Sequence, residues 1–426
     1  MIRTVAFYTL GCKLNFAETS DMSRQFSAAG YQVVDFKETA DVYVINTCAV
    51  TAIAEKKGRT IIHQIVRRNP DSIIAVIGCF SQLSPEEIAQ IQGVDIILGN
   101  NDKYKILNYI DHCDKQRSVT STSSPSDFVL SYSSDDRTRT FLKIQDGCDY
   151  FCSYCTIPFA RGHNRSARIA DIAHIVEQLA QQHVNEIVLT GINIGEFGKH
   201  HHETFLQLLQ VLETTPIPRF RISSIEPNLI TEEMITFIAA STKILPHFHI
   251  PLQSGCDRIL NLMRRKYSRQ LFADKINSIK QQIPHSFIAA DVIAGFPSET
   301  EADFMDTVQF IERLPLAYLH VFPYSERKNT QALTIAEKVS PIEKKRRREL
   351  LQTLSTQKHQ QFYQQQTDSV HHVLWEATQH RNTMYGFTDN YIRVKKTFDC
   401  QAVNTIETVT LSHLDADGIF SVDSHK

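Results

Sequence analysis

Three cysteines stand close together in the middle of the chain. In the stretch 146–162 (DGCDYFCSYCTIPFARG), Cys148, Cys152 and Cys155 have the spacing C-x3-C-x2-C. Thiolates on so short a loop can hold three irons of a cubane iron–sulfur cluster and leave the fourth iron open to another ligand. Zinc is the alternative, but it normally takes four protein ligands, and His163 is the only further candidate nearby. The spacing therefore favours a [4Fe-4S] cluster with one open iron.

Three further cysteines, Cys12, Cys48 and Cys79, are widely separated in the chain. Each follows an apolar run that predicts a strand: FYTLGC, VYVINTC and IAVIGC. The gaps between them fit one strand–helix–strand crossover each, and such crossovers are right-handed and join parallel strands. Because α/β folds bind ligands at the carboxyl ends of their strands, we expect the three thiols to meet there. The sequence thus predicts a second three-cysteine cluster.

An α/β architecture must position these cysteines. Residues 1–113 alternate strand and helix patterns, as in a parallel sheet, and the Ser- and Thr-rich residues 114–139 predict a linker. Residues 140–366 contain six strand–helix units, which predicts a partial (β/α)6 barrel because a closed barrel needs eight. This segment ends in a long basic helix, 341–366. Residues 367–426 show only short strands and predict a small all-β barrel.

Two longer elements are predicted within these domains, a helix over 258–282 and a strand over 384–395. A further helix is expected over 18–29. The predicted barrel strands are 141–145, 186–190, 219–225, 248–252, 287–293 and 317–322.

Composition restricts the class of protein. The 426 residues carry a formal net charge of −2, so a basic footprint for nucleic acid must be local. No apolar run approaches the roughly 18 residues that span a bilayer, and the first residues lack the layout of a signal peptide. We therefore expect a cytoplasmic protein without membrane association, whose nine cysteines serve as metal ligands or bystanders rather than in disulfides.

The central motif resembles the signature of the radical S-adenosylmethionine (SAM) superfamily, with Tyr154 as the aromatic residue before the last cysteine. The resemblance implies that the open iron binds SAM, that one electron cleaves SAM to a 5′-deoxyadenosyl radical, and that Tyr154 lies near the adenine. Gly191 and Gly295 end barrel strands and could let SAM approach the backbone; a plain turn is the alternative. Glu226 could contact SAM or the substrate base, or be a paired structural carboxylate.

Nearly the whole chain resembles the methylthiotransferases of this superfamily. TLGCKLN, INTCAVT and VIGCFSQ match their N-terminal motifs, PLQSGCD and DVIAGFPSET match later core segments, and GFTDNYIRV looks like their C-terminal TRAM module. The segments GCKLN, SSIEP and GFTDNYIRV are most similar to the branch that modifies N6-threonylcarbamoyladenosine. The resemblance implies two [4Fe-4S] clusters, two SAM molecules and conversion of this nucleoside, at position 37 of the tRNA anticodon loop, into its 2-methylthio derivative.

The implied reaction explains why two clusters and two SAM molecules would be needed. The hydrogen at C2 of adenine has no useful acidity, so a carbon radical, not a general base, must activate it. Sulfur would be delivered at the second cluster, and electrons would come from a donor such as a flavodoxin or ferredoxin. The sequence identifies no catalytic side chain. The alternatives are the sister branches, which act on isopentenyladenosine in tRNA or on a ribosomal protein, and a non-catalytic iron–sulfur RNA-binding protein.

Local basic groups are the candidates for tRNA contact. Arg161, Arg165 and Arg168 follow the cysteine loop, and a basic run lies in the predicted long helix. We expect both groups to contact phosphates, although such a run is commonly a solvated helix face. The run consists of Lys344, Lys345, Arg346, Arg347 and Arg348.

Aromatic and histidine side chains are further candidates for contacts with RNA or a metal. Phe387, Tyr391 and Trp375 could stack on loop bases, with core packing equally expected for Trp375. His247 and His249 lie on one face of a predicted strand. Because no carboxylate or third histidine is expected nearby, we expect them to pack in the core or line a site rather than to bind a metal.

Overall fold

The computed structural model describes residues 3–49, 51–113, 119–133 and 138–422. The chain divides into two compact units. Unit 1 comprises residues 1–134, 141–167 and 325–330, and unit 2 comprises residues 135–140, 168–324 and 331–426. All six cysteines that the sequence suggests as cluster ligands therefore belong to unit 1. The three domain boundaries expected from the sequence stay predictions.

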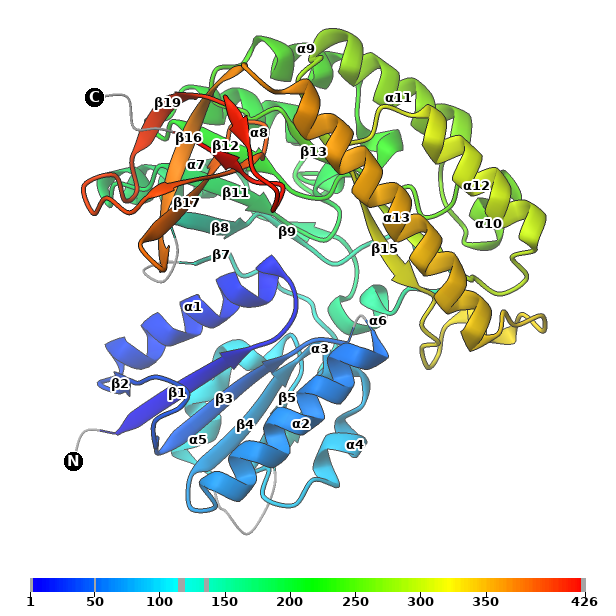
Figure 1. Ribbon diagram of the computed structural model, residues 1–426. Helices are drawn as coiled ribbons and strands as arrows, with labels where there is room; N and C mark the ends of the chain where they lie inside the picture. Colours follow the sequence, from blue (N-terminus) through cyan, green and yellow to red (C-terminus); the bar gives the residue numbers. More distant parts are fainter. Residues whose placement is uncertain (1–2, 50, 114–118, 134–137, 423–426) are drawn as a thin grey trace. The chain divides into compact units, whose positions relative to one another are not determined.

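Unit 1 is built on a parallel sheet with the strand order β2-β1-β3-β4-β5-β6 (Figure 1, blue and cyan). The runs VYVINT and IIAVIG form its central strands and are buried almost throughout, as expected for a parallel sheet covered on both faces. Part of the predicted linker adds the edge strand β6. The strands are β1 (Thr4–Thr9), β2 (Gln32–Val33), β3 (Val42–Thr47), β4 (Ile73–Gly78), β5 (Ile96–Leu98) and β6 (Val119–Ser121).

Helices cover both faces of this sheet. On one face, Met22 and Phe26 of α1 (Lys13–Ala28) and Ile110 of α5 (Ile106–Asp111) join a core with Val44 and Ile77. The other face packs against α2 (Ala52–Arg68), α3 (Cys79–Leu83) and α4 (Pro85–Ala89). A short helix, η1 (Asp102–Lys105), precedes α5. Helix α1 begins five residues before the predicted helix because Cys12 is its N-cap.

The central cysteine loop of unit 1 is closed by two short strands. β9 (Gln145–Asp146) pairs antiparallel with β10 (Arg165–Ser166), so the two ends of the loop are held side by side. Within the loop lies α6 (Ile157–Arg161). β7 (Ser131–Tyr132) pairs with the end of β8 (Arg139–Lys143), the predicted first barrel strand, which runs across the boundary between the units.

Unit 2 contains the remaining strands of the predicted partial barrel. Pairs β11–β12, β13–β14 and β14–β15 are parallel, and single bridges join the segments around β12 and β13. The strands are β11 (Glu186–Thr190), β12 (Arg219–Ile222), β13 (His247–His249), β14 (Phe287–Ala294) and β15 (Tyr318–Pro323). Along the chain, helices alternate with these strands (Figure 1, green to orange). They are α7 (Ile169–Gln181), α8 (Phe205–Glu213), α9 (Glu232–Ala240), α10 (Asp257–Leu262), α11 (Arg269–Gln282), α12 (Glu301–Arg313) and α13 (Pro341–Gln365), with η2 (Ile194–Glu196), η3 (Pro227–Leu229) and η4 (Gln331–Thr334).

A curled sheet completes unit 2, with the order β19-β16-β17-β18-β21-β20. Its core contains Trp375, which is fully buried and donates a hydrogen bond from Nε1 to Glu407 at 2.7 Å. This burial shows that Trp375 packs in the core and does not present its ring to bases. The strands are β16 (Val370–His380), β17 (Thr383–Thr388), β18 (Arg393–Thr397), β19 (Ile406–Thr410), β20 (His413–Leu414) and β21 (Phe420–Ser421).

The predicted fold class is confirmed: a parallel α/β sheet, a set of β/α units and a C-terminal all-β module. Two predicted elements are each split in two. The helix over 258–282 breaks into α10 and α11, where Arg264 has φ +58° and Ser268 caps α11. The strand over 384–395 is the hairpin β17–β18, which turns at Tyr391 with φ +71°. Among the described residues, no helix is long and apolar enough to cross a membrane.

Candidate functional site

The N-terminal trio of cysteines lies at one edge of the unit 1 sheet. Cys12 follows β1, Cys48 follows β3 and Cys79 follows β4, and these three strands are neighbours that run parallel. The strand order 2-1-3-4-5 changes direction between β1 and β3, and α/β sheets bind ligands at the carboxyl ends of the strands beside such a point. The expected convergence at this edge is therefore what the topology produces.

Close packing of the backbone brings the first two cysteine loops together. A Cβ on Gly11 would lie 2.7 Å from Cys48 Cβ and 2.9 Å from its Sγ, and Gly11 has φ +104°. Only glycine fits a position with both properties. Gly78, which precedes Cys79, likewise has φ +97° and no room for a Cβ, which would lie 2.5 Å from Asn46 Oδ1. Gly-Cys pairs thus turn the chain sharply as it leaves β1 and β4.

Charged and amide groups surround the thiols of Cys12 and Cys79. Cys12 is accessible to solvent, yet the surrounding protein raises the pKa of its thiol by desolvation, while the charge of Arg161 lowers it and that of Cys79 raises it. Asn100 Nδ2 lies 3.5 Å from Cys79 Sγ. Asn15 Nδ2 donates to the backbone carbonyls of Leu10 and Thr47, at 2.7 and 3.2 Å, and so fixes two of the three loops.

The central trio is organised by its own backbone. Gly147 has φ +71°, and a Cβ there would lie 1.9 Å from the carbonyl oxygen of His163. The Cys155 N–H donates to the Cys152 carbonyl at 3.0 Å. Two backbone N–H groups point at sulfur: that of Tyr150 lies 3.5 Å from Cys148 Sγ, and that of Ile157 lies 3.5 Å from Cys155 Sγ. Such N–H groups favour a thiolate over a thiol.

A buried network of five charged side chains lies between the two trios (the unit 1 ion network: Glu18, Lys103, Lys143, Asp146 and Arg161). Each of the five is at most 5% exposed. Glu18 accepts hydrogen bonds from Lys103 at 2.6 Å, from Lys143 at 3.1 Å and from Arg161 at 3.0 and 3.2 Å. Asp146 accepts from Arg161 at 3.0 and 3.1 Å. Three cations face two carboxylates, so the network carries one excess positive charge.

This network ties the two cysteine regions to each other. Arg161 ends α6, which follows the central trio, and its Nη2 donates to Asn15 Oδ1 at 2.6 Å, three residues after Cys12. Asn100 Nδ2, which lies near Cys79 Sγ, also donates to the carbonyl of Ala160 at 2.7 Å. A negative group held by the thiols of the N-terminal trio would lie beside the excess positive charge, which would stabilise it.

The network also shifts the pKa of its own members. Burial raises the pKa of Glu18, but the charges of Arg161, Lys103 and Lys143 outweigh it and hold the pKa well below the usual range. For Asp146, burial is again opposed by Arg161 and Lys143, and the pKa falls to about 2. Both carboxylates are therefore ionised at neutral pH.

The residues that the sequence suggested for SAM lie in both units. Tyr154 belongs to the central loop of unit 1, whereas Gly191, Glu226 and Gly295 follow strands of unit 2. Glu226 forms an ion pair with Arg265, and burial is the main cause that raises its pKa. Gly295 has φ +78°, and a Cβ there would lie 2.4 Å from Cγ of Lys344. A SAM role for these four residues stays a prediction.

The three arginines after the central loop differ in exposure. Arg161 is buried in the ion network, and Arg165 donates to the carbonyls of Arg161 and His163 at 2.7 and 3.1 Å. Of the three, Arg168 is the exposed one. The burial of Arg161 argues against the phosphate contact predicted for it.

The basic run on α13 is divided between exposed and buried side chains. Lys345 is 69% exposed and Arg346 46%, whereas Arg347 is 5% exposed and pairs with Glu299 at 2.8 Å. Lys344 lies over the ring of Tyr324, 4.9 Å from its centroid, and the Arg348 side chain is 36% exposed. A phosphate contact from this run stays a prediction, best suited to the exposed members.

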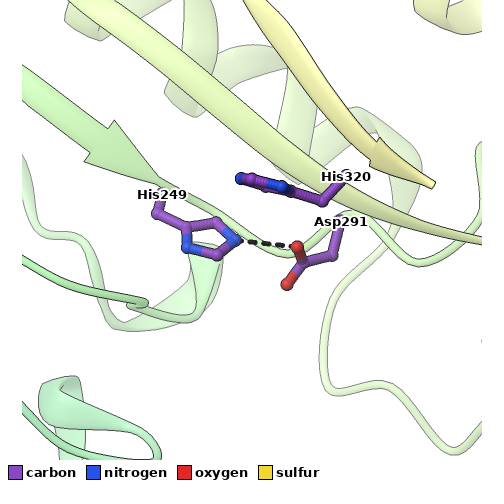
Figure 2. A group of neighbouring side chains, drawn as sticks. All are labelled: His249, Asp291 and His320. Carbon is purple, nitrogen blue, oxygen red and sulfur yellow. Dashed lines mark hydrogen bonds and ion pairs between the residues drawn. The ribbon is translucent and has the colours of Figure 1, made fainter. Parts of the chain in front are cut away.

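Sequence reasoning missed two groups of polar side chains. The ion network has no short-range signal, apart from Asp146 standing two residues before Cys148. For His249 the expectation that no carboxylate or further histidine lies nearby was wrong, because Asp291 and His320 lie beside it in the folded chain (Figure 2). His247, by contrast, packs its ring against Phe287 at 5.7 Å between centroids, as expected.

The donor chemistry of the two cysteine sites fits iron–sulfur clusters. All six cysteines are free thiols. Both sites combine thiols with nearby N–H donors and with glycines that admit a close approach, and such N–H groups tune iron–sulfur clusters.

Comparisons with known proteins agree with this reading. Two family models match the chain, the uncharacterized protein family UPF0004 over residues 4–99 and the radical SAM superfamily over residues 142–311. The threonylcarbamoyladenosine tRNA methylthiotransferase MtaB of Bacillus subtilis is 43% identical over 92% of this chain and 90% of its own length. The MtaB of Aquifex aeolicus is 38% identical over 92% and 96%. A tRNA-2-methylthio-N(6)-dimethylallyladenosine synthase of Clostridium tetani is 32% identical over 89% and 87%.

Solved structures show the same fold at low identity. The radical SAM methyltransferase TsrM of Kitasatospora setae superposes with a TM-score of 0.56 at 14% identity, over 75% of this chain and 73% of that one. The fold and the cysteine sites define a radical-SAM enzyme, a transferase that uses SAM and an iron–sulfur cluster. Within that class, the chain belongs to the MtaB-type methylthiotransferases.

Proposed function

We propose that this enzyme converts N6-threonylcarbamoyladenosine at position 37 of the tRNA anticodon loop into its 2-methylthio derivative. The observation that supports this most strongly is the presence of two three-cysteine sites in one compact unit, joined by a buried ion network. One site would suffice to cleave SAM, so a second site requires a second task, and sulfur insertion is the task that the relatives' names supply.

The net reaction replaces the C2–H bond of adenine by a C2–S–CH3 group. One SAM takes up an electron, yields methionine, and carries the hydrogen away as 5′-deoxyadenosine. A second SAM donates the methyl group and leaves as S-adenosylhomocysteine. The initiating electron comes from a reduced protein donor such as a flavodoxin or ferredoxin. The sulfur would enter at the sulfide level from the N-terminal site, and the electron released when the C2 radical bonds to it would return to the iron–sulfur sites. The hydrogen has no useful acidity, so no side chain acts as a general base on it.

Specific residues would hold the two cofactor clusters. When bound, a [4Fe-4S] cluster at Cys148, Cys152 and Cys155 supplies the reductive cleavage of SAM, and one at Cys12, Cys48 and Cys79 supplies the sulfur. The chain's own contribution is electrostatic and geometric. The glycines before the first cysteine of each trio turn the backbone so that the thiols converge, and the excess positive charge of the ion network stabilises the thiolates of the N-terminal trio.

Single cysteine variants, one in each trio, separate SAM cleavage from sulfur insertion. The full chain, reconstituted without oxygen, should bind about eight irons and form the methylthio nucleoside in tRNA that carries threonylcarbamoyladenosine, as read by mass spectrometry. Cys152→Ala should lose both SAM cleavage and product. Cys48→Ala should still cleave SAM but form no product.

The matched control is Cys400→Ala, because Cys400 is an exposed free thiol of the C-terminal sheet region. It should bind the same iron and turn over like the wild type. Normal methylthiolation by Cys48→Ala would overturn the sulfur-insertion role of the N-terminal trio. If product formed only from dimethylallyladenosine, the substrate of this chain would be the nucleoside in the name of the C. tetani relative instead.

A further inference from the structure

Three polar side chains of unit 2 meet on one face of the β/α strands (the strand triad: His249, Asp291 and His320). They come from β13, β14 and β15 (Figure 2). Asp291 and His320 are direct partners across β14 and β15, and His249 stands opposite Ala289, two residues before Asp291. Because side chains alternate along a strand, this register places all three on the same face.

The triad is tightly grouped. His249 Nε2 lies 2.8 Å from Asp291 Oδ1, and the rings of His249 and His320 have centroids 5.0 Å apart. One nitrogen from each imidazole and one carboxylate oxygen all lie within 4.8 Å of one another. The side chains of His249 and Asp291 keep 23% and 19% exposure, so they are half-buried and still accessible.

The position along the strands is that of a binding site. Towards the start of β14, the same face carries Phe287 and Ala289, which are buried in the apolar core. Towards the carboxyl ends, β15 presents Phe322, which is 44% exposed. The triad thus lies where the face passes from apolar packing to the open end, and β/α folds bind ligands at that end. The charge of Asp291 also acts on Glu226, which follows β12.

The chemistry of the triad selects the kind of ligand. Imidazole N–H groups can donate to a carboxylate or carbonyl oxygen, and the Asp291 carboxylate retains acceptor capacity for hydroxyl or amide hydrogens beyond its bond to His249. A threonylcarbamoyl group offers a carboxylate, a hydroxyl and amide N–H groups. A dimethylallyl group is a hydrocarbon and would leave half-buried polar groups without partners, which is costly.

We propose that His249, Asp291 and His320 bind the polar amino-acid substituent on N6 of the adenosine and thereby select the threonylcarbamoyl over the dimethylallyl substrate. This inference rests on the proposed function and adds to it the residues that decide the substrate. A site built around substrate hydroxyl and N–H groups rejects an analogue that lacks them far more strongly than an apolar pocket rejects a polar one.

The test compares two anticodon stem-loop RNAs, one with threonylcarbamoyladenosine and one with dimethylallyladenosine, on the fully reconstituted chain. His320→Leu and Asp291→Asn should each lower kcat/KM for the first RNA by about tenfold or more, mainly through KM. His320→Leu should lower turnover of the first RNA far more than it lowers SAM cleavage without RNA. His320→Gln, which keeps a donor, should lose less than His320→Leu.

The matched control is His174→Leu, which removes an exposed histidine of α7 and should behave like the wild type. If the wild type methylthiolates the first RNA and the triad variants match His174→Leu, the triad inference fails while the proposed function stands. If the wild type modifies neither RNA, or only the second, the proposed function itself fails. Two imidazoles and a carboxylate also suit a divalent transition metal. Retention by the wild type of one zinc or manganese per chain, lost in His320→Leu, would replace the proposal by a metal site.

Discussion

Glu18 is the central acceptor of the unit 1 ion network, and its replacement by glutamine gives the sharpest test of that network. Glu18 is completely buried and receives hydrogen bonds from Lys103, Lys143, Arg161 and the Tyr104 hydroxyl. Glutamine keeps nearly the same shape and removes only the charge. The three cations would then face one carboxylate, so the buried excess rises from one positive charge to two.

The structure sets the expected size of this effect. Removing one partner of a buried ion pair typically costs about 3–5 kcal/mol, because the remaining charge is left in a low-dielectric interior. With a urea m-value of about 2 kcal/mol per molar, the unfolding midpoint of unit 1 should fall by about 1.5–2.5 M. The wild-type contribution is present at neutral pH because the lowered pKa keeps Glu18 ionised.

Hydrogen–deuterium exchange in rising urea, read on peptides from β3 and β4, reports on unit 1 separately from unit 2. Glu86→Gln is the matched control, since Glu86 is an exposed carboxylate of α4 in the same unit. It should change the unfolding free energy of unit 1 by less than about 1 kcal/mol. Equal midpoints for the Glu18 and Glu86 variants would refute the view that the buried network stabilises the cysteine-bearing unit.

Three further predictions follow from single contacts. Gly11→Ala should lower the iron content by about four irons per chain while SAM cleavage continues, because the added Cβ would collide with Cys48; full iron content would contradict this. Lys345→Met should weaken tRNA binding in anisotropy titrations and reduce the slope of log K against log salt concentration by about one. Arg347→Met should instead lower the free energy of unfolding measured in urea melts. For Glu186, the effect of burial on the pKa is outweighed by Arg221 and Arg219, which lower the pKa to about 2. Its contribution of about 3 kcal/mol to the free energy of unfolding is complete above pH 4.5 and is lost as the pH falls towards 2. Acid melts of Glu186→Gln should not show this loss.

Much of the fold could be predicted because its signals are local. The central strands of unit 1 are continuous apolar runs, and the helices of unit 2 begin at capping residues such as Thr204 and Thr300, whose side chains accept from the backbone three residues on. Prediction was wrong where a break depends on one backbone angle. The turn at Tyr391 has φ +71°, which a side chain of this kind rarely adopts. The preceding Asp389-Asn390 pair is a turn signal that the strand prediction did not use.

For the cysteines too, local features could be predicted and long-range contacts could not. Strand-ending positions, together with the parallel crossovers between them, were enough to predict that Cys12, Cys48 and Cys79 share one edge of a sheet. The placement of the central loop in the same compact unit was not predictable. It depends on hydrogen bonds from Arg161 to Glu18 and Asn15, which lie 143 and 146 positions earlier in the chain.

The sequence alone determined the residue types and the spacing of the two three-cysteine sites, together with the elements that carry them. Only the tertiary structure decided which charges lie beside those sites and which histidine meets which aspartate. The physical reason is that strand and helix periodicity is set by near neighbours. A buried ion pair or a shared pocket is instead stabilised by groups that are distant in the chain, and it exists only once the chain has folded and excluded water from around them.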